Sequence, residues 1–220
     1  TSTMQQEAAK QLGFSAGRTM RAAQKLYEGV ELGDQGSVGL ITYMRTDSVR
    51  VSDAAIQQAR EYINAQFDKR YLPDEPNVYK GGRGSKVQDA HEAIRPTEVG
   101  LRPEDVKKYL ERDLLKLYQL IWRRFIASQM NPAVYEATKV DFDLANGKFL
   151  FRATGSRVIF DGYHAVYQEA YEAEDAKTLG SLEPIPPLKE GDKVALKQVV
   201  PSQHFTEPPP RYSEASLVKE

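Results

Sequence analysis

The hydrophobic pattern of this chain changes its period near Asn131-Pro132, and this change constrains the fold more than any other feature. Before it, apolar residues recur every three or four positions, which is typical of amphipathic helices. The strongest such stripe comprises Leu114, Leu117, Leu120, Ile121 and Phe125. After it, apolar and polar residues alternate in VYEATKVDFDL and KFLFRATG, which the turn dipeptide Asn146-Gly147 joins. The sequence therefore predicts an α+β protein, helical over 1–131 and antiparallel β over 132–207.

Three further boundaries complete the predicted organisation. LITYM (40–44), RVIFDGYHAVYQ (157–168) and DKVALKQVV (192–200) predict additional strands. The three prolines at 208–210 predict a stiff connector, after which Ser213 can cap a helix. Because the chain begins with Thr1 and stops within this last helix, we expect a fragment of a longer protein, with 208–220 opening a further domain.

Composition excludes several classes of protein. The chain has no cysteine, which removes disulfides, thiolate zinc sites and cysteine nucleophiles. No apolar run approaches about 18 residues, so we expect no membrane span. These features fit a globular protein of the reducing cytoplasm.

Charge is unevenly divided, although the net charge is only −1. Residues 1–132 carry 20 Lys and Arg against 17 Asp and Glu, whereas residues 133–220 carry 10 against 14. A nucleic-acid-binding domain is often more basic than this. The charge therefore permits a polyanionic partner for the helical part, and whether it binds one has to be judged from the motifs.

The first motif whose residues could take part in a reaction is GLITYMRTDS, residues 39–48. If it is extended, side chains alternate, and Ile41, Tyr43 and Arg45 share one side. A free phenol has a pKa near 10 and is a poor nucleophile at neutral pH. A fixed cation beside it favours phenolate and stabilises charge on a phosphate under attack. The alternative is a half-buried strand tyrosine with a surface arginine.

The second motif is QDAHEAIRPT, residues 88–97. Pro96 disfavours helix at Arg95, so the segment is interpreted as a turn. His91 and Arg95 could grip a phosphate together. The alternative is that His91 caps a helix end and Arg95 pairs with Glu92 or Asp89.

The remaining polar clusters predict no separate site. The spacing of the three histidines fits no metal-ligand pattern, so no metal site is predicted. KGGRGSK (80–86) lacks the spacing of a nucleotide-binding P-loop and is interpreted as a solvated loop. Arg123 and Arg124 are interpreted as the solvated edge of an amphipathic helix.

Five motifs together resemble bacterial type IA DNA topoisomerases, in order and across nearly the whole chain. They are TSTMQQEA, GLITYMRTDS, QDAHEAIRPT, LYQLIWRRF and HFTEPPPRYSEASLVKE. The combination of GLITYMRTDS with HEAIRPT is the most specific part of the resemblance.

The resemblance implies a role for each candidate residue. Tyr43 would be the nucleophile that attacks single-stranded DNA, leaving a 5′-phosphotyrosine and a free 3′-hydroxyl. Arg45 would orient the scissile phosphate, and His91, grouped with Arg95, would bind phosphate nearby. Because one phosphoester replaces another, the enzyme would pass a strand, reseal the break and relax negative supercoils without ATP.

The resemblance also implies an architecture. The tyrosine domain would be a winged-helix, CAP-like unit on a β domain that acts as the hinge of a toroid, with part of the sheet supplied from before Thr1. Mg²⁺ would be bound by a preceding acidic domain, so we expect no cofactor within these residues and no relaxation by this chain alone. The expected partner is single-stranded or negatively supercoiled DNA, without a membrane, and the expected state is a monomer.

Two other functions remain open at the level of sequence. One is a non-catalytic single-stranded DNA-binding module on the same scaffold. The other is a tyrosine recombinase, which also uses tyrosine with arginine and histidine but forms a 3′-phosphotyrosine.

Overall fold

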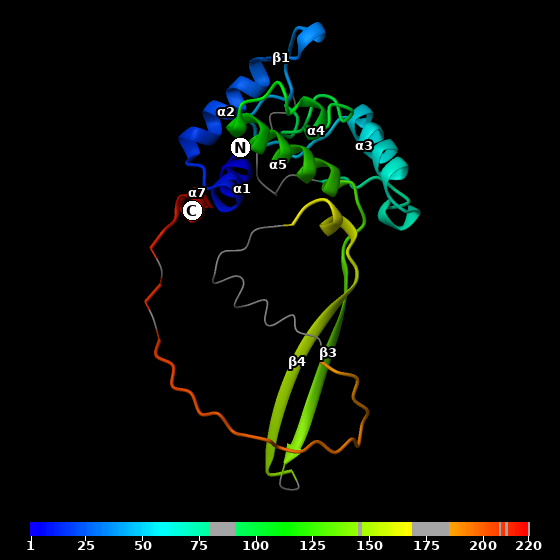
Figure 1. Cartoon of the computed structure of the whole chain (residues 1–220), viewed down its shortest axis with the longest axis vertical. Helices are drawn as coiled ribbons and strands as arrows, with labels where there is room; N and C mark the ends of the chain where they lie inside the picture. Colours follow the sequence, from blue (N-terminus) through cyan, green and yellow to red (C-terminus); the bar gives the residue numbers. More distant parts are fainter. Residues whose placement is uncertain (80–90, 145–146, 169–184, 207, 210, 220) are drawn as a thin grey trace.

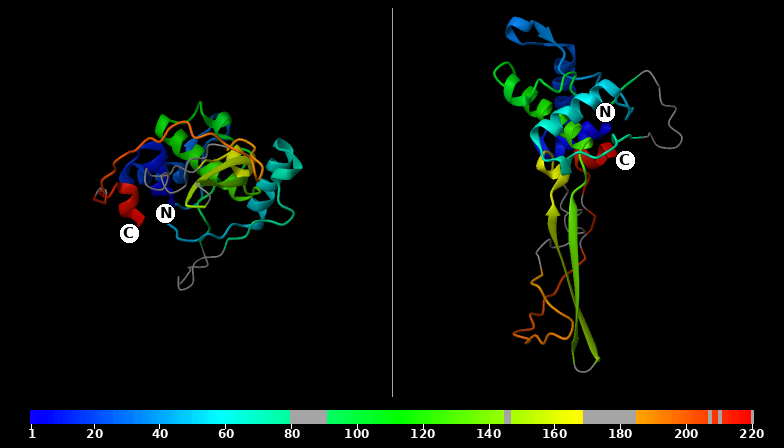
Figure 2. Two further views of the ribbon diagram at one scale, coloured as in Figure 1. Left: turned by 90° about the horizontal axis from the view of Figure 1, so that it is seen from below. Right: turned by 90° about the vertical axis from the view of Figure 1, so that its right-hand side faces the viewer.

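The fold is a cluster of helices from which a long two-stranded ribbon projects (Figure 1). The computed structural model describes residues 1–79, 91–144, 147–168, 185–206, 208–209 and 211–219. After the ribbon the chain returns to the helices, so that both termini lie at the same end of the molecule (Figure 1). Figure 2 shows from the side that the ribbon extends away from the helical cluster.

The helical unit is built around one central helix. Its helices are α1 (Ser2–Leu12), α2 (Ala16–Glu28), α3 (Asp53–Gln66), α4 (Pro103–Val106) and α5 (Arg112–Ser128). All four of the others pack against α5, whose predicted apolar stripe is buried. Between α2 and α3 lie two short paired strands, β1 (Val30–Glu31) and β2 (Ser37–Val38), with the 3₁₀ turn η1 (Gly33–Gln35) between them.

Local sequence explains where the first two helices begin and end. Gly13 adopts a left-handed conformation with φ of 66° and terminates α1, and its amide donates to carbonyls of the last turn. The Ser15 side chain accepts a hydrogen bond from the Arg18 amide at 3.2 Å and caps α2. The helical interpretation of these segments is confirmed.

The ribbon consists of β3 (Val134–Leu144) and β4 (Phe149–Phe160), paired antiparallel along their whole length. Two ion pairs bridge the strands, Asp141 with Arg152 at 2.6 Å and Glu136 with Arg157 at 2.5 Å. Exposed pairs of this kind contribute little stability, although they favour the observed register. The predicted hairpin is therefore confirmed in its strands and its pairing.

The base of the ribbon is fixed to the helices by close contacts. The Tyr71 hydroxyl, in the turn η2 (Lys69–Tyr71), donates to the Asp161 carboxylate at 2.6 Å. Gly162, in the turn η3 (Gly162–Ala165), has φ of 51°, and a Cβ there would lie 2.5 Å from the Pro132 carbonyl oxygen. Glycine is required at this junction for both reasons.

Three strand predictions are wrong. Residues 157–168 form no separate strand, because β4 continues to Phe160 and the turn η3 follows. Residues 192–200 form no strand, and within 185–206 the structure shows neither helix nor strand. Alternation is only a local signal, and no described strand pairs with the backbone of this segment. Residues 40–44 bend at Thr42 and Met44 and make only an isolated bridge, between Ile41 and Pro96.

The C-terminal helix α7 (Glu214–Lys219) packs on α1, as Figure 1 shows. Its Glu214 carboxylate accepts a hydrogen bond from the Ala16 amide at 2.7 Å, so it also caps the start of α2. Ser213 caps α7 as expected, since its hydroxyl accepts from the Ser216 amide at 3.1 Å. The division into domains at 131 and 207 stays a prediction.

Candidate active site

Tyr43 lies in the irregular segment that connects β2 to α3. Backbone hydrogen bonds hold this segment on both sides. The Leu40 amide donates to the Leu26 carbonyl at 2.7 Å, which joins it to the end of α2. The Thr42 amide donates to the Arg95 carbonyl at 2.9 Å, which joins it to the HEAIRPT motif. The two motifs singled out in the sequence therefore lie side by side.

Exposed and buried residues alternate along 43–48. Tyr43, Arg45 and Asp47 are exposed, while Met44 and Thr46 between them are buried. Tyr43 and Arg45 therefore share the solvent side. Ile41 does not join them: it is 1% exposed and belongs to the core, because the alternation breaks where Leu40 and Ile41 are both buried.

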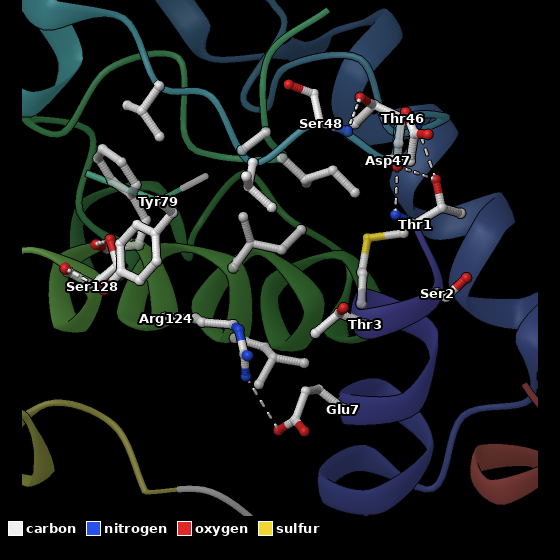
Figure 3. A pocket seen from close by; sticks show the side chains of 18 of the residues that line it. Thr1, Ser2, Thr3, Glu7, Thr46, Asp47, Ser48, Tyr79, Arg124 and Ser128 are labelled. Carbon is white, nitrogen blue, oxygen red and sulfur yellow. Dashed lines mark hydrogen bonds and ion pairs between the residues drawn. The ribbon is translucent and has the colours of Figure 1, made fainter. Parts of the chain in front are cut away.

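Side-chain hydrogen bonds fix the backbone on either side of Arg45. The Thr1 hydroxyl donates to the Met44 carbonyl at 2.7 Å and accepts from the Thr46 amide at 2.9 Å. The Thr46 hydroxyl in turn accepts from the Ser48 amide at 3.0 Å. Figure 3 shows Thr1 at the start of α1 reaching Thr46 beside the cavity. The start of α1 thus holds Arg45 in place.

Two aromatic rings, those of His91 and Tyr27, lie against the Tyr43 ring. The centroids of Tyr43 and His91 lie 5.7 Å apart with the rings tilted by 31°. The Tyr27 ring approaches Tyr43 edge-on, at 5.3 Å between centroids. The Tyr43 side chain nevertheless keeps access to solvent, since the residue is 38% exposed.

Arg45 and His91 both line a cavity of about 900 Å³. In the part of the chain that the structure describes, no hydrogen bond or ion pair engages the Arg45 guanidinium. The structure thus brings together three of the four predicted site residues: Tyr43 contacts His91, and His91 shares the cavity with Arg45. A phosphate at the cavity mouth would meet both side chains, each of which can donate a hydrogen bond to it.

Arg95, the fourth predicted residue, is directed inward. Its guanidinium forms an ion pair with Glu92 at 2.7 Å, donates to the Pro96 carbonyl at 2.9 Å and donates to the Ser52 hydroxyl at 3.3 Å. Its side chain is only 12% exposed. This geometry matches the alternative pairing with Glu92, and phosphate binding by Arg95 stays a prediction.

Arg124 departs from its interpretation as a solvated helix edge. Arg123 is exposed, but Arg124 lines the cavity, where it lies 3.7 Å from Glu7 and donates to the Tyr167 hydroxyl at 2.9 Å (Figure 3 shows its pairing with Glu7). Tyr167 in turn donates to Glu7, and burial together with this bond raises the pKa of its phenol. The helical period alone could not show that a residue so distant as Tyr167 covers this face.

Neither Tyr27 nor Glu7 was singled out by the motifs. The apolar period places Tyr27 on the same stripe as Ala23, which is typical of a core residue. Instead Tyr27 is 40% exposed and its ring meets Tyr43. Only the long-range pairing of 39–48 with α2 reveals that contact.

The described residues offer no group of three His, Cys, Asp or Glu side chains that could hold a metal ion. They therefore do not fit a Mg²⁺ site. Among the same residues, no helix has the length and apolar character needed to cross a membrane. The KGGRGSK loop (80–86) lies outside the described residues.

A sequence model of the family described as DNA topoisomerase matches residues 1–220. The chain belongs to the DNA topoisomerase family. Among its curated relatives, DNA topoisomerase 1 of Rickettsia bellii is 49% identical and that of Xylella fastidiosa 48% identical, each over the whole of this chain. The structure of full-length topoisomerase I from Thermotoga maritima matches the whole chain with a TM-score of 0.76 and 42% identity, and the match covers 33% of that protein.

The resemblance found in the motifs is thereby confirmed, as is the mixed α and β class. The chain spans 27% of the length of each of these two curated relatives.

Proposed function

We propose that this chain carries the DNA-cleaving tyrosine of a longer type IA DNA topoisomerase, with Tyr43 as the nucleophile. The observation that carries the proposal is the placement of Tyr43 against His91, which in turn shares one cavity with Arg45. A half-exposed phenol beside two side chains able to bind phosphate fits an attack on a phosphodiester.

The proposed reaction conserves phosphoester bonds. The Tyr43 oxygen loses its proton and forms a bond to phosphorus, while the bond from phosphorus to the 3′ oxygen breaks. The 3′ oxygen takes up a proton, which leaves a 5′-phosphotyrosine and a free 3′-hydroxyl. The reverse step reseals the strand after another strand has passed, so no ATP is needed.

Arg45 and His91 have distinct parts in this proposal. Arg45, exposed on the same side as Tyr43, orients the phosphate and stabilises the charge that develops on it. His91 contacts phosphate beside the Tyr43 ring. Arg95 supports the two motifs through Glu92 and the backbone, and a direct phosphate contact would require it to leave Glu92.

We also propose the larger assembly in which this chain works. Residues 1–131 form the winged-helix-like tyrosine domain, 132–207 contribute to the hinge of a toroid, and 208–220 lead into a further domain. The ribbon, attached at a narrow base, supports the hinge role. The complete enzyme acts as a monomer in the cytoplasm on single-stranded or negatively supercoiled DNA, with Mg²⁺ held outside these residues.

The proposal is tested in a completed enzyme, in which residues 1–220 replace the matching part of the Thermotoga maritima protein. It is incubated with end-labelled single-stranded DNA, denatured and examined for protein-linked DNA. We expect linked DNA with the unchanged chain and with the control Tyr109→Phe, and none with Tyr43→Phe. DNA binding without any linkage would instead support a non-catalytic DNA-binding module.

A further inference from the structure

Tyr27 contacts the proposed nucleophile but has no part in the chemistry above. Its ring meets Tyr43 edge-on, with 5.3 Å between centroids and 63° between planes. This is a favourable geometry for an aromatic pair. The hydrophobic core does not explain its position, because α2 buries other residues, namely Thr19, Ala22, Ala23 and Leu26.

The backbone holds these two tyrosines together. The Leu40 amide donates to the Leu26 carbonyl at 2.7 Å, immediately before Tyr27. A Cβ at Gly39 would lie 2.6 Å from the Tyr27 carbonyl oxygen, which is closer than a side chain tolerates. Glycine at 39 therefore lets the tyrosine segment approach the end of α2 closely enough for the rings to touch.

The hydrogen bonds of Leu40 and Thr42 fix the backbone around Tyr43, but they do not fix its side-chain torsions. A half-exposed phenol would otherwise sample several rotamers. Among the described residues, the rings that contact Tyr43 are those of Tyr27 and His91. His91 is already assigned to the phosphate, so Tyr27 is the ring available to orient the phenol.

We propose that Tyr27 is a positioning residue, whose ring holds the Tyr43 phenol in the orientation needed to attack the phosphate; this rests on the proposed function. Holding a nucleophile in its reactive geometry lowers the entropy lost on reaching the transition state. The aromatic ring of Tyr27 carries this role, and its hydroxyl does not.

The test is single-turnover cleavage by the completed enzyme at saturating single-stranded DNA. Tyr27→Ala is expected to cleave about three- to tenfold more slowly, the range that an aromatic pair contact supports. Tyr27→Phe keeps the ring and should cleave at nearly the unchanged rate. The melting temperature and the Kd for DNA should be the same in all three proteins. Tyr109→Ala removes a tyrosine of similar exposure away from Tyr43 and should have no effect on the rate.

Gly39→Ala provides a second, independent perturbation, because its methyl group must separate the segment from the Tyr27 carbonyl. We expect slower cleavage, and adding Tyr27→Ala should slow it little further, since both changes remove one contact. Full additivity of the two effects would contradict a shared mechanism.

Three results would overturn the inference: an unchanged rate in Tyr27→Ala, a defect confined to DNA affinity, or failure of Tyr27→Phe to restore the rate. If the unchanged chain still forms DNA linked to Tyr43, the proposed function survives any of these. If the unchanged chain forms no linked DNA, the proposed function fails and the positioning role fails with it.

Discussion

Thr42 and Arg95, 53 residues apart in the sequence, are joined by hydrogen bonds in both directions. The Thr42 amide donates to the Arg95 carbonyl at 2.9 Å, and the Arg95 amide donates to the Thr42 hydroxyl oxygen at 3.0 Å. Thr42 precedes Tyr43, and Arg95 belongs to the motif of His91. This pairing therefore brings the proposed nucleophile to the proposed phosphate contact.

Replacing Thr42 with valine tests that pairing. The change keeps the shape and the backbone bond but leaves the Arg95 amide and the Ala93 carbonyl without their side-chain partner. We expect a loss of about 1–3 kcal/mol in the free energy of unfolding, together with slower cleavage. Urea unfolding measures the loss of stability, with Thr138→Val on the ribbon as the control. Unchanged stability and cleavage would show that the side-chain bridge is dispensable.

Arg95→Ala separates support of the fold from contact with DNA. Because the pair with Glu92 is largely buried, we expect the variant to lose about 2–4 kcal/mol of stability. If Arg95 only supports the fold, the salt dependence of single-stranded DNA binding stays the same. A fall of about 0.7 in the slope of log K against log salt would instead assign it one phosphate.

Arg45→Ala is expected to change the chemistry and not the fold. Its side chain is exposed, so the melting temperature should not change. Loss of one preorganised donor typically slows a reaction about 10²–10³-fold, and we expect this range in single-turnover cleavage. The cleavage rate of Arg45→Lys should lie between those of Arg45→Ala and the unchanged protein, because lysine keeps the charge but loses the planar fork. Arg123→Ala, at an exposed arginine outside the cavity, is the control. A variant that melts early yet cleaves normally would contradict the role of Arg45.

Stability should fall in alkali because of a buried phenol. Burial raises the pKa of Tyr118, whose hydroxyl donates to the Leu101 carbonyl at 2.6 Å. The stabilising contribution of the un-ionised Tyr118 phenol is fully present below the pKa of the unfolded state, about 10. It is lost as pH rises above that value toward the pKa of the folded state. Urea midpoints measured from about pH 9 to 11 should therefore decline, and less steeply in Tyr118→Phe than in the exposed control Tyr212→Phe. Equal slopes in the two variants would contradict this.

Much of the fold could be predicted because its signals are local. The helical periods, the cap at Ser213 and the alternation of the ribbon each depend on neighbouring residues. The expected strand at 192–200 had the same local pattern but no described strand paired with it. Alternation shows that a segment can form a strand, whereas pairing decides whether it does.

The site could be predicted in part, for the same reason. The motifs gave Tyr43, Arg45 and His91, of which His91 meets the Tyr43 ring and lines one cavity with Arg45. The contact of Tyr27 with Tyr43, the inward direction of Arg95 and the pairing of Arg124 with Tyr167 depend on segments distant in sequence. None of these has a local signal.

The most direct test of the account is to locate the DNA linkage chemically. Trypsin cleaves after Lys25 and Arg45, so Tyr27 and Tyr43 fall in one peptide, residues 26–45. Fragmentation of this peptide from the completed enzyme, trapped on DNA and trimmed with nuclease, distinguishes the two tyrosines. We predict a nucleotide joined through its 5′ phosphate to Tyr43. Linkage to Tyr27, to any other residue, or through a 3′ phosphate would contradict the account.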